Sequence, residues 1–216
     1  ALAVFLSYPT AETAALIAPA MQTLAVDGIV PLALVRRLGP LAKELSQDDL
    51  YEVQSRYVDL FDRTRSLSLQ LYEHVHGESR DRGQAMVDLI EEYRAHGFEP
   101  VSHELPDYLP LFLEFLSLCA ADEARRLLDD AVHVVAHIGR QLASRSSPYA
   151  CVLQALATLA SVRPAYMDEY ERLQGELNTL YVGWREGDGR ALAWRLEKLN
   201  EPRLCARLVD GLGRYA

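Results

Sequence analysis

The chain has 216 residues, of which 50% are hydrophobic and 25% are charged, and its formal net charge at pH 7 is -9. This size and composition predict one soluble globular domain, and they exclude a membrane-spanning segment because no apolar run approaches the roughly 20 residues that cross a bilayer. The negative charge, together with the lack of interleaved basic and aromatic residues, argues against binding to nucleic acid.

Three widely spaced cysteines, Cys119, Cys151 and Cys205, lie among leucines and alanines. Small apolar surroundings of this kind are typical of buried, reduced thiols, so we expect a reducing compartment and a cytoplasmic protein. No signal peptide is visible in the sequence. The first residue is Ala1 rather than Met, which leaves open whether the natural chain begins further upstream.

Nearly every segment repeats its apolar residues with a helical period, and no stretch alternates as a strand would, so the sequence predicts an all-α fold. A first clear helix is expected to begin at Ser46, with Asp49 three residues on in a capping arrangement. A second should cover residues 64–75 and end at Gly77. The later predicted helices cover 81–96, begin at Asp107 with Pro110 in the first turn, and cover 122–142 and 147–159.

The last part of the chain differs from the rest in charge. Residues 190–216 contain six basic and three acidic side chains, a net of +3, so the remaining residues carry -12. We expect a helical domain over 1–164 and a C-terminal helical extension over 165–216, basic from residue 190. A further expectation is that this basic tail docks on an acidic groove of its own or a neighbouring chain, which leaves a homodimer open.

No motif of a common catalytic or nucleotide-binding class occurs. The phosphate-binding pattern GxxxxGK[ST], the dinucleotide pattern GxGxxG and the nucleophile pattern GxSxG are all missing. His133 and His137 have the four-residue spacing of a zinc-binding helix, but residue 134 is Val where the HExxH pattern requires Glu. Both histidines lie opposite the apolar stripe of their helix and should be solvated. We therefore predict neither an enzyme nor a metal site.

Two polar segments are candidates for a binding role. The first is the turn over 73–83, in which His74, His76 and several charges follow a helix. The two-residue spacing puts the imidazoles on different sides of a helix, which argues against a shared metal ion. A capped helix end, a partner-binding turn and a carrier site for a cofactor or metal all remain open. The second is the stiff, proline-containing loop over 104–110, for which a structural and a binding role stay equally open.

Three blocks of the sequence resemble one family. Residues 57–62 (YVDLFD), 71–83 (LYEHVHGESRDRG) and 104–115 (ELPDYLPLFLEF) are similar, in this order and spacing, to the NarJ-type delta subunit of respiratory nitrate reductase. Residues 6–9 (LSYP) are similar too, and the resemblance covers about residues 1–160. It implies membership in the wider class of TorD-like redox enzyme maturation chaperones, whose fold is a single-domain helical bundle.

The resemblance implies a cytoplasmic, non-enzymatic chaperone. Such a protein binds the N-terminal segment of the apo catalytic (alpha) subunit of a respiratory nitrate reductase, in a groove built from the central helices and the loop at 104–107, and promotes insertion of the molybdenum cofactor. It would hold no cofactor permanently. Transient contact with bis-molybdopterin guanine dinucleotide stays open, as do a carrier role for the 73–83 turn and a different molybdoenzyme as client. The residues expected to bind the client peptide are Tyr57, Asp59, Phe61, Tyr72, Glu73, His74, His76, Glu104, Asp107 and Tyr108.

Overall fold

Every element that the structure describes is helical. The computed structural model describes residues 1–77, 79–100 and 104–161, and these contain ten α-helices, one π-helical turn and one 3-10 turn but no strand. A single isolated bridge pairs Gln70 with Tyr108. The prediction of an all-α fold is therefore confirmed.

The described residues belong to the first of two units of the chain, Ala1–Pro164. The predicted extension over 165–216, with its basic stretch and Cys205, lies outside the described residues, so the domain boundary stays a prediction. Among the described residues, no helix combines the length and the apolar character that crossing a membrane requires.

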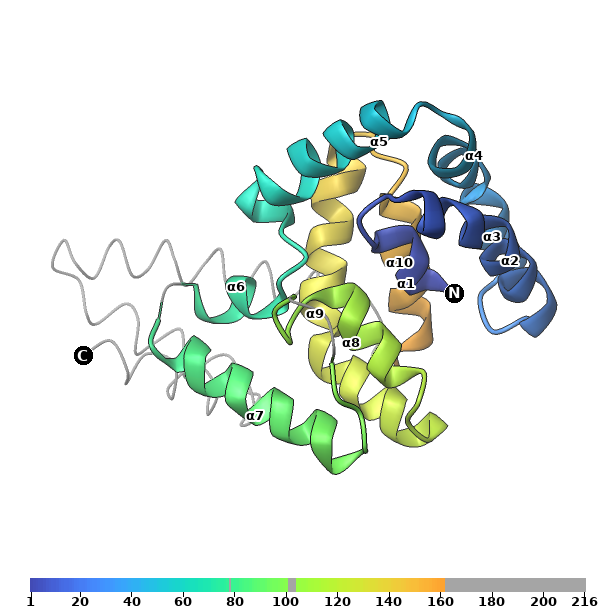
Figure 1. Cartoon of the computed structure of the whole chain (residues 1–216). Helices are drawn as coiled ribbons and strands as arrows, with labels where there is room; N and C mark the ends of the chain where they lie inside the picture. Colours follow the sequence, from blue (N-terminus) through green and yellow to red (C-terminus); the bar gives the residue numbers. More distant parts are fainter. Residues whose placement is uncertain (78, 101–103, 162–216) are drawn as a thin grey trace, which may run out of the picture. The chain divides into compact units, whose positions relative to one another are not determined.

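The helices are arranged around a central pair, α9 and α10 (Figure 1). Within this arrangement α1 and α3 contact α10, whereas α6 and α8 contact α9. The elements in chain order are α1 (Leu2–Leu6), α2 (Ala11–Asp27), α3 (Leu32–Arg37), α4 (Gly39–Gln47), α5 (Leu50–Tyr57), a π-helical turn (Val58–Asp62), a 3-10 turn (Arg65–Leu67), α6 (Leu71–His76), α7 (Asp81–Ala95), α8 (Leu109–Leu116), α9 (Ala121–Ser144) and α10 (Ala150–Leu159).

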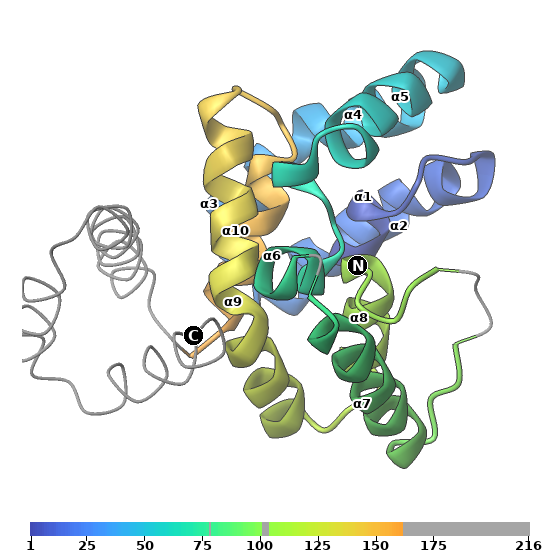
Figure 2. The ribbon, with the colours of Figure 1, turned by 90° about the vertical axis from the view of Figure 1, so that its left-hand side faces the viewer.

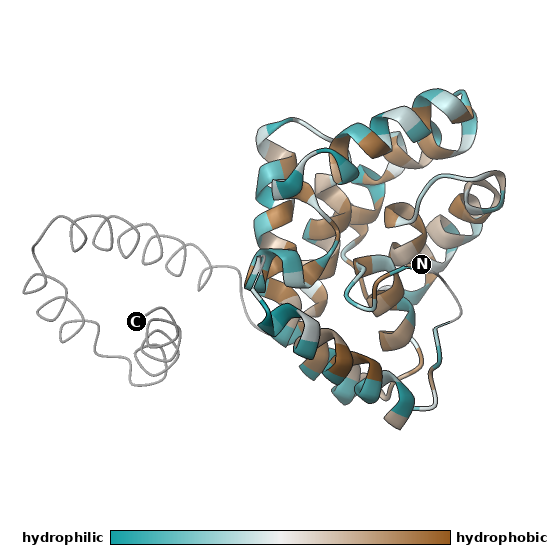
Figure 3. Ribbon diagram, turned by 60° about the vertical axis from the view of Figure 1, so that its left-hand side comes forward, coloured by the Kyte–Doolittle hydropathy of each residue, from teal (hydrophilic) through white to brown (hydrophobic). Residues whose placement is uncertain are grey.

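Hydrophobic residues gather where the helices face one another (Figure 3). Six of the eight residues of α8 are buried, because this short helix contacts both α1 and α9. In contrast, the much longer α9 is amphipathic and buries mainly one face, the stripe that its sequence predicts. The core therefore forms one continuous cluster that includes residues of α1, α8, α9 and α10.

The packing of α9 against α10 involves a glycine. Gly139 follows the fully buried Ile138 on α9. A Cβ built on this glycine would stand 3.0 Å from Cβ of Leu153 on α10. A contact this short is tighter than close-packed interiors normally contain, so Leu153 would have to shift to admit a side chain at residue 139. The missing side chain at Gly139 therefore sets how closely these two helices approach.

The helix predicted to begin at Ser46 begins later. Ser46 lies in the last turn of α4, where its hydroxyl donates to the carbonyl of Ala42 at 2.7 Å. Asp49 is the N-cap of α5 instead, and its carboxylate accepts from the amides of Tyr51 and Glu52. The predicted start at Ser46 is wrong because a serine hydroxyl can bond back to the preceding helix as readily as it caps the next.

The helix predicted over 64–75 is wrong in its first half. The chain forms a 3-10 turn at Arg65–Leu67, and a regular helix begins only at Leu71. The Leu71 amide donates to the carbonyl of Asp107 at 3.0 Å, so this long-range hydrogen bond replaces a helical one. The end of α6 agrees with the prediction, since Gly77 follows it with a φ of 56°.

Three smaller expectations need correction. Asp107 does not cap α8, because Tyr108 is the N-cap residue and no side chain bonds to the helix start. His133 and His137 are half-buried rather than solvated, and the ring of His137 lies 5.9 Å from that of His74, because α6 packs on that side of α9. Cys119 and Cys151 are free thiols, but both are half-buried rather than buried.

Candidate functional site

A groove opens between α1, α2, α8, the start of α9 and the end of α10, and it encloses about 1040 Å³. This volume reaches the upper end of the range of about 300–1,000 Å³ that is usual for small-molecule pockets, so the groove can accept several side chains at once. Its floor is apolar. The buried residues of this floor include Leu2, Leu24, Leu111, Leu116, Leu128 and Leu156.

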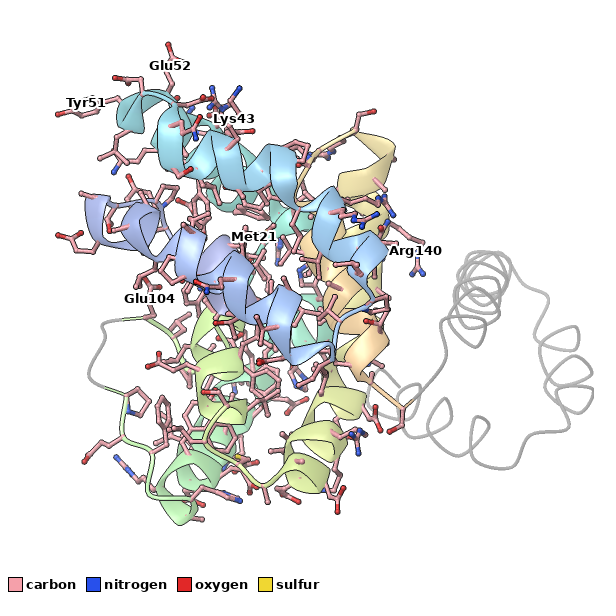
Figure 4. The ribbon with its side chains drawn as sticks, turned by 90° about the vertical axis from the view of Figure 1, so that its right-hand side faces the viewer. Met21, Lys43, Tyr51, Glu52, Glu104 and Arg140 are labelled. Atoms are coloured by element: carbon pink, nitrogen blue, oxygen red, sulfur yellow. The ribbon has the colours of Figure 1, made fainter. Side chains whose placement is uncertain are left out.

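Acidic side chains stand at the edge of the groove. Asp27, Glu104 and Glu114 line it and are exposed. Arg125 alone is basic among the described lining residues, and it pairs with Asp122 at 3.5 Å. Figure 4 looks at the side of the protein that carries α2, where Glu104 stands at the start of the loop leading to α8. An apolar floor with an acidic edge suits an amphipathic, positively charged ligand.

The loop before α8 is held by the segment that leads into α6. The Leu71 amide donates to the carbonyl of Asp107 at 3.0 Å, and the Leu109 amide donates to the carbonyl of Leu69 at 2.8 Å. From α7, the hydroxyl of Tyr93 donates to the carbonyl of Pro106 at 2.7 Å. Figure 2 shows α6, α7 and α8 gathered at this corner. The two blocks 71–83 and 104–115 are therefore joined through the backbone.

Asp107 lies inside this junction. Its side chain has no exposed area, and Oδ2 accepts from the Tyr72 amide at 2.9 Å. Nη2 of Arg82 lies 3.9 Å from the same oxygen. Burial raises the pKa of Asp107, while the Tyr72 amide and the charge of Arg82 act in the opposite direction. A client could not reach this carboxylate while the loop stays in place.

A group of aromatic rings lies beneath the groove wall. Tyr57 is 3% exposed, and its hydroxyl donates to the carbonyl of Leu6 at 2.7 Å. The hydroxyl of Tyr108 lies 2.8 Å from that of Tyr57. Burial raises the pKa of Tyr57 well above its usual range and that of Tyr108 to about 12, so both rings stay neutral at physiological pH. Phe61 completes the group, with its ring centroid 4.8 Å from that of Tyr57.

Two of the ten residues predicted to bind the client, Glu104 and Tyr108, line the groove. Tyr57, Phe61 and Asp107 are buried next to it or beneath it. Each of these three residues is at most 3% exposed. A direct contact between them and a client peptide stays a prediction.

The other five predicted residues lie away from the groove and have local partners. The carboxylate of Asp59 pairs with Arg63 at 2.6 Å, and that of Glu73 pairs with Arg65 at 3.1 Å. Nε2 of His74 bonds to the carbonyl of Ser68 at 2.8 Å. The ring of His76 lies 5.5 Å from that of Tyr72 in an edge-on contact. These contacts account for much of the polar character of the 73–83 turn.

Sequence reasoning missed the side of the groove that α1 and α2 provide. Leu2, Leu16 and Leu24 of these helices line the groove, and none of them belongs to a motif. One signal was available: Leu16 and Ile17 are adjacent on a helix, so α2 has apolar residues on more than one side. Ile17 is buried in the core, and the 50% exposed Leu16 faces the groove.

One group of possible metal ligands occurs among the described residues, away from the groove. Ligand atoms of Glu92, His96 and Glu123 lie within 4.8 Å of one another. Arg126 pairs with both carboxylates of this group, because its Nη2 donates to Glu123 at 2.6 Å and lies 3.8 Å from Glu92. The ion pairs give a sufficient explanation for these carboxylates, so we assign them no metal.

The sequence matches the family model described as nitrate reductase delta subunit over residues 31–155. A second model, for clusterin-associated protein-1, matches residues 121–199, which is less than half of the chain. The first match includes the 73–83 turn, the loop before α8, and α8 and α9 of the groove, but it does not include α1 or α2.

Curated relatives agree with the first family model. The nitrate reductase molybdenum cofactor assembly chaperone NarJ of Escherichia coli (strain K12) is 43% identical over 140 residues, which cover 65% of this chain and 59% of that protein. The probable assembly chaperone NarW of the same strain is 44% identical over 133 residues, or 60% of this chain and 58% of that protein. The probable NarJ of Bacillus subtilis (strain 168) is 34% identical over 100 residues, or 46% and 54%.

These relatives bear the names of assembly chaperones rather than of catalysts. The chain spans less than two thirds of the length of the curated relatives that it matches. The resemblance of blocks 57–62, 71–83 and 104–115 to this family is confirmed by both comparisons. The chain belongs to the nitrate reductase delta subunit family.

Proposed function

We propose that this protein is a non-catalytic assembly chaperone of a respiratory nitrate reductase, acting in the cytoplasm. The proposal takes its general role from the relatives, which are named for assembly of the nitrate reductase molybdenum cofactor. The observation that carries it is the groove with a leucine-rich floor and the exposed carboxylates of Asp27, Glu104 and Glu114. A groove of this kind suits the capture of a polypeptide better than the catalysis of a reaction.

The proposed ligand is the N-terminal segment of the catalytic subunit, bound as an amphipathic, positively charged helix. Its apolar face would bury leucines of the floor and provide most of the affinity, because removal of apolar surface from water is the main driving force. Its basic residues would meet the carboxylates at the edge, which raises the association rate and selects against acidic peptides. Bound in this way, the segment keeps the apo subunit attached while cofactor is inserted.

The same edge argues against the groove as a site for the cofactor itself. Bis-molybdopterin guanine dinucleotide carries pyrophosphate groups, and exposed Asp27, Glu104 and Glu114 would repel them. In the 73–83 turn, Arg82 is directed to Asp107 and Glu73 pairs with Arg65. These contacts favour a chaperone that binds its client over a carrier that binds the cofactor, and the carrier role stays an untested alternative.

Calorimetry with the full chain tests the proposal. The titrant is a synthetic peptide with the first ~20 residues of the cognate catalytic subunit, which reach ~30 Å as a helix. We expect saturable binding with a Kd in the micromolar range or tighter, a negative heat-capacity change from apolar burial, and weaker binding at high salt. A matched peptide with its apolar residues changed to Ser should not bind.

Two outcomes would count against the proposal. Equal affinity for the cognate peptide and for the Ser-substituted peptide would mean that the apolar floor is not used. Stronger binding of a leader peptide from a different molybdoenzyme would keep the chaperone role but change the client. A titration with a guanine dinucleotide in the same buffer tests the carrier alternative directly.

A further inference from the structure

Arg82 and Asp107 connect two segments that are far apart in the chain. Arg82 lies in the first turn of α7, and its Nη2 stands 3.9 Å from Oδ2 of Asp107 in the loop before α8. Arg82 keeps 24% of its side chain exposed, whereas Asp107 keeps none. Neither residue lines the groove. Any effect of this pair on the groove must therefore pass through the loop that it holds.

The carboxylate of Asp107 depends on its partners. A buried, ionised carboxylate is costly unless hydrogen bonds and an opposite charge compensate for the lost hydration. The Tyr72 amide provides one hydrogen bond to Oδ2 at 2.9 Å, and Arg82 provides the charge. Without Arg82, the loop would keep Asp107 buried only with the carboxylate protonated or with the loop displaced toward water.

The pair is also able to make a second contact. Nε of Arg82 and Oδ1 of Asp107 are both buried, and neither has a hydrogen-bond partner among the described residues. One is a donor and the other an acceptor. Guanidinium and carboxylate groups match at two points, so a small side-chain movement would turn the present single approach into a two-point pair. A lysine could supply the charge but not this geometry.

Asp107 is directly connected to the groove wall. Tyr108 follows it in the chain and lines the groove, with its hydroxyl 2.8 Å from that of Tyr57. The carbonyl of Asp107 is fixed from the other side by the Leu71 amide. The position of Asp107 therefore determines where Tyr108 stands and whether its hydroxyl reaches Tyr57.

We propose that Arg82 is a positioning residue for the groove: by holding Asp107, it fixes Tyr108 in the groove wall and so sets the affinity for the client. This inference rests on the proposed function, because client affinity is the property that the groove supplies. The 73–83 turn then influences the client from beneath the groove without touching it.

The first test compares two arginine variants in the calorimetric titration. Arg82→Gln removes the positive charge and the two-point donor geometry of the guanidinium, and we expect the cognate peptide to bind about tenfold more weakly. Arg80→Gln is the matched control, because Arg80 is exposed and lies two residues earlier in the same segment. It should change the Kd less than about twofold. Equal effects of the two substitutions would overturn the proposal.

A second comparison separates positioning from general destabilisation. If Arg82 acts through the Tyr108 side chain, Arg82→Gln should change the Kd less than about twofold in a Tyr108→Ala background, since coupled residues give non-additive effects. A tenfold weaker affinity from Arg82→Gln in that background would contradict the proposal. Arg82→Lys keeps the charge, so it should bind the cognate peptide more tightly than Arg82→Gln does, but less tightly than the wild type. If Arg82→Gln does not fold, Arg82→Lys takes its place in both comparisons. No recovery would contradict an ion-pair role.

A measurement without client keeps the inference independent of the proposed function. In protein labelled with ¹³C-tyrosine, Arg82→Gln should shift the ring signals of Tyr108, and Arg80→Gln should leave them in place. Unmoved Tyr108 signals would overturn the positioning role even if the peptide binds. Conversely, shifted signals in a protein that binds no peptide would support the positioning role and reject the proposed function.

Discussion

The hydroxyl oxygens of Tyr57 and Tyr108 lie 2.8 Å apart, although 51 residues separate them in the chain. Both hydroxyls also reach the carbonyl of Leu6, that of Tyr57 at 2.7 Å and that of Tyr108 at 3.4 Å. This relay ties three parts of the groove region together: α1, the end of α5 and the loop before α8. The groove wall therefore depends on groups that do not face the groove.

Tyr57→Phe should destabilise the protein by about 1–2 kcal/mol, because it removes two hydrogen bonds from a buried site and leaves the carbonyl of Leu6 with only the longer contact to the Tyr108 hydroxyl, at 3.4 Å. Urea denaturation measures the change. Tyr51→Phe is the control, since Tyr51 is 81% exposed and points away from the protein in Figure 4. It should alter stability by less than about 0.5 kcal/mol. Equal effects of the two substitutions would mean that the hydroxyl relay contributes nothing.

Gly139→Val should destabilise the protein by about 1–3 kcal/mol, because new methyl groups would press against Leu153 on α10. The melting temperature and urea midpoint report the loss. Gly83→Ala provides a contrast in α7, where a Cβ would meet nothing within 4 Å. That change should be neutral or stabilising by up to about 1 kcal/mol, because alanine favours helices. A stable Gly139→Val variant would show that the two helices can separate freely.

Glu104→Gln should weaken binding of the cognate peptide roughly two- to fivefold at low salt, mainly through a slower association rate, because it removes one carboxylate from the groove edge. Stopped-flow or surface plasmon resonance separates the two rates. Glu52→Gln is a matched control, since Glu52 is 71% exposed, lies on α5 and does not line the groove (Figure 4). An equal change in both variants would indicate an effect of net charge rather than of the groove.

Stability should fall as the pH is lowered through the range in which His74 titrates. Burial, mainly, and the nearby His137 lower the pKa of His74, while the carbonyl of Ser68 and the charges of Glu73 and Asp107 oppose the shift. A histidine in the unfolded chain has a pKa of about 6.5. Below that pH, His74 is protonated in the unfolded chain but stays neutral in the folded protein until the pH reaches its lowered pKa. The free energy of unfolding therefore decreases as the pH falls from about 6.5 to the pKa of His74 in the folded protein.

His74→Gln tests this dependence. Urea denaturation of both proteins between pH 7.5 and pH 5, in ~0.5-unit steps, gives two slopes of the unfolding free energy against pH. The wild type should lose more stability per pH unit than the variant, by at most about 1.4 kcal/mol per unit for one proton. Identical slopes would show that His74 does not titrate differently in the folded protein.

Helical periodicity identified the parts of the fold in which local sequence and packing agree. The stripe of α9 is one example, because residues three and four apart share a face regardless of what packs against it. The end of α6 at Gly77 is another, because a residue with a φ of 56° is easiest for glycine. The helices before Ser46 were harder to predict, since none of them has a clear one-sided apolar stripe or a distinctive motif.

The candidate site was identified in part. The resemblance located the 73–83 turn and the 104–110 loop, and the structure shows that they are joined through Asp107. It also shows that Asp107 and Tyr57 are buried, a property that a sequence motif does not reveal. A carboxylate in a motif looks the same whether it faces a ligand or the interior.

The sequence by itself determined the all-helical class, the acidic charge, the family and the position of the two polar segments at 73–83 and 104–110, because these properties depend on residue types and their spacing. Only the tertiary structure decided that Asp107 bonds to Tyr72 and approaches Arg82 instead of capping α8, and that Tyr57 and Tyr108 meet. The physical reason is that these contacts join residues 25 or more positions apart. Their existence depends on how α1, α5, α7 and α8 pack, and no local pattern encodes that packing.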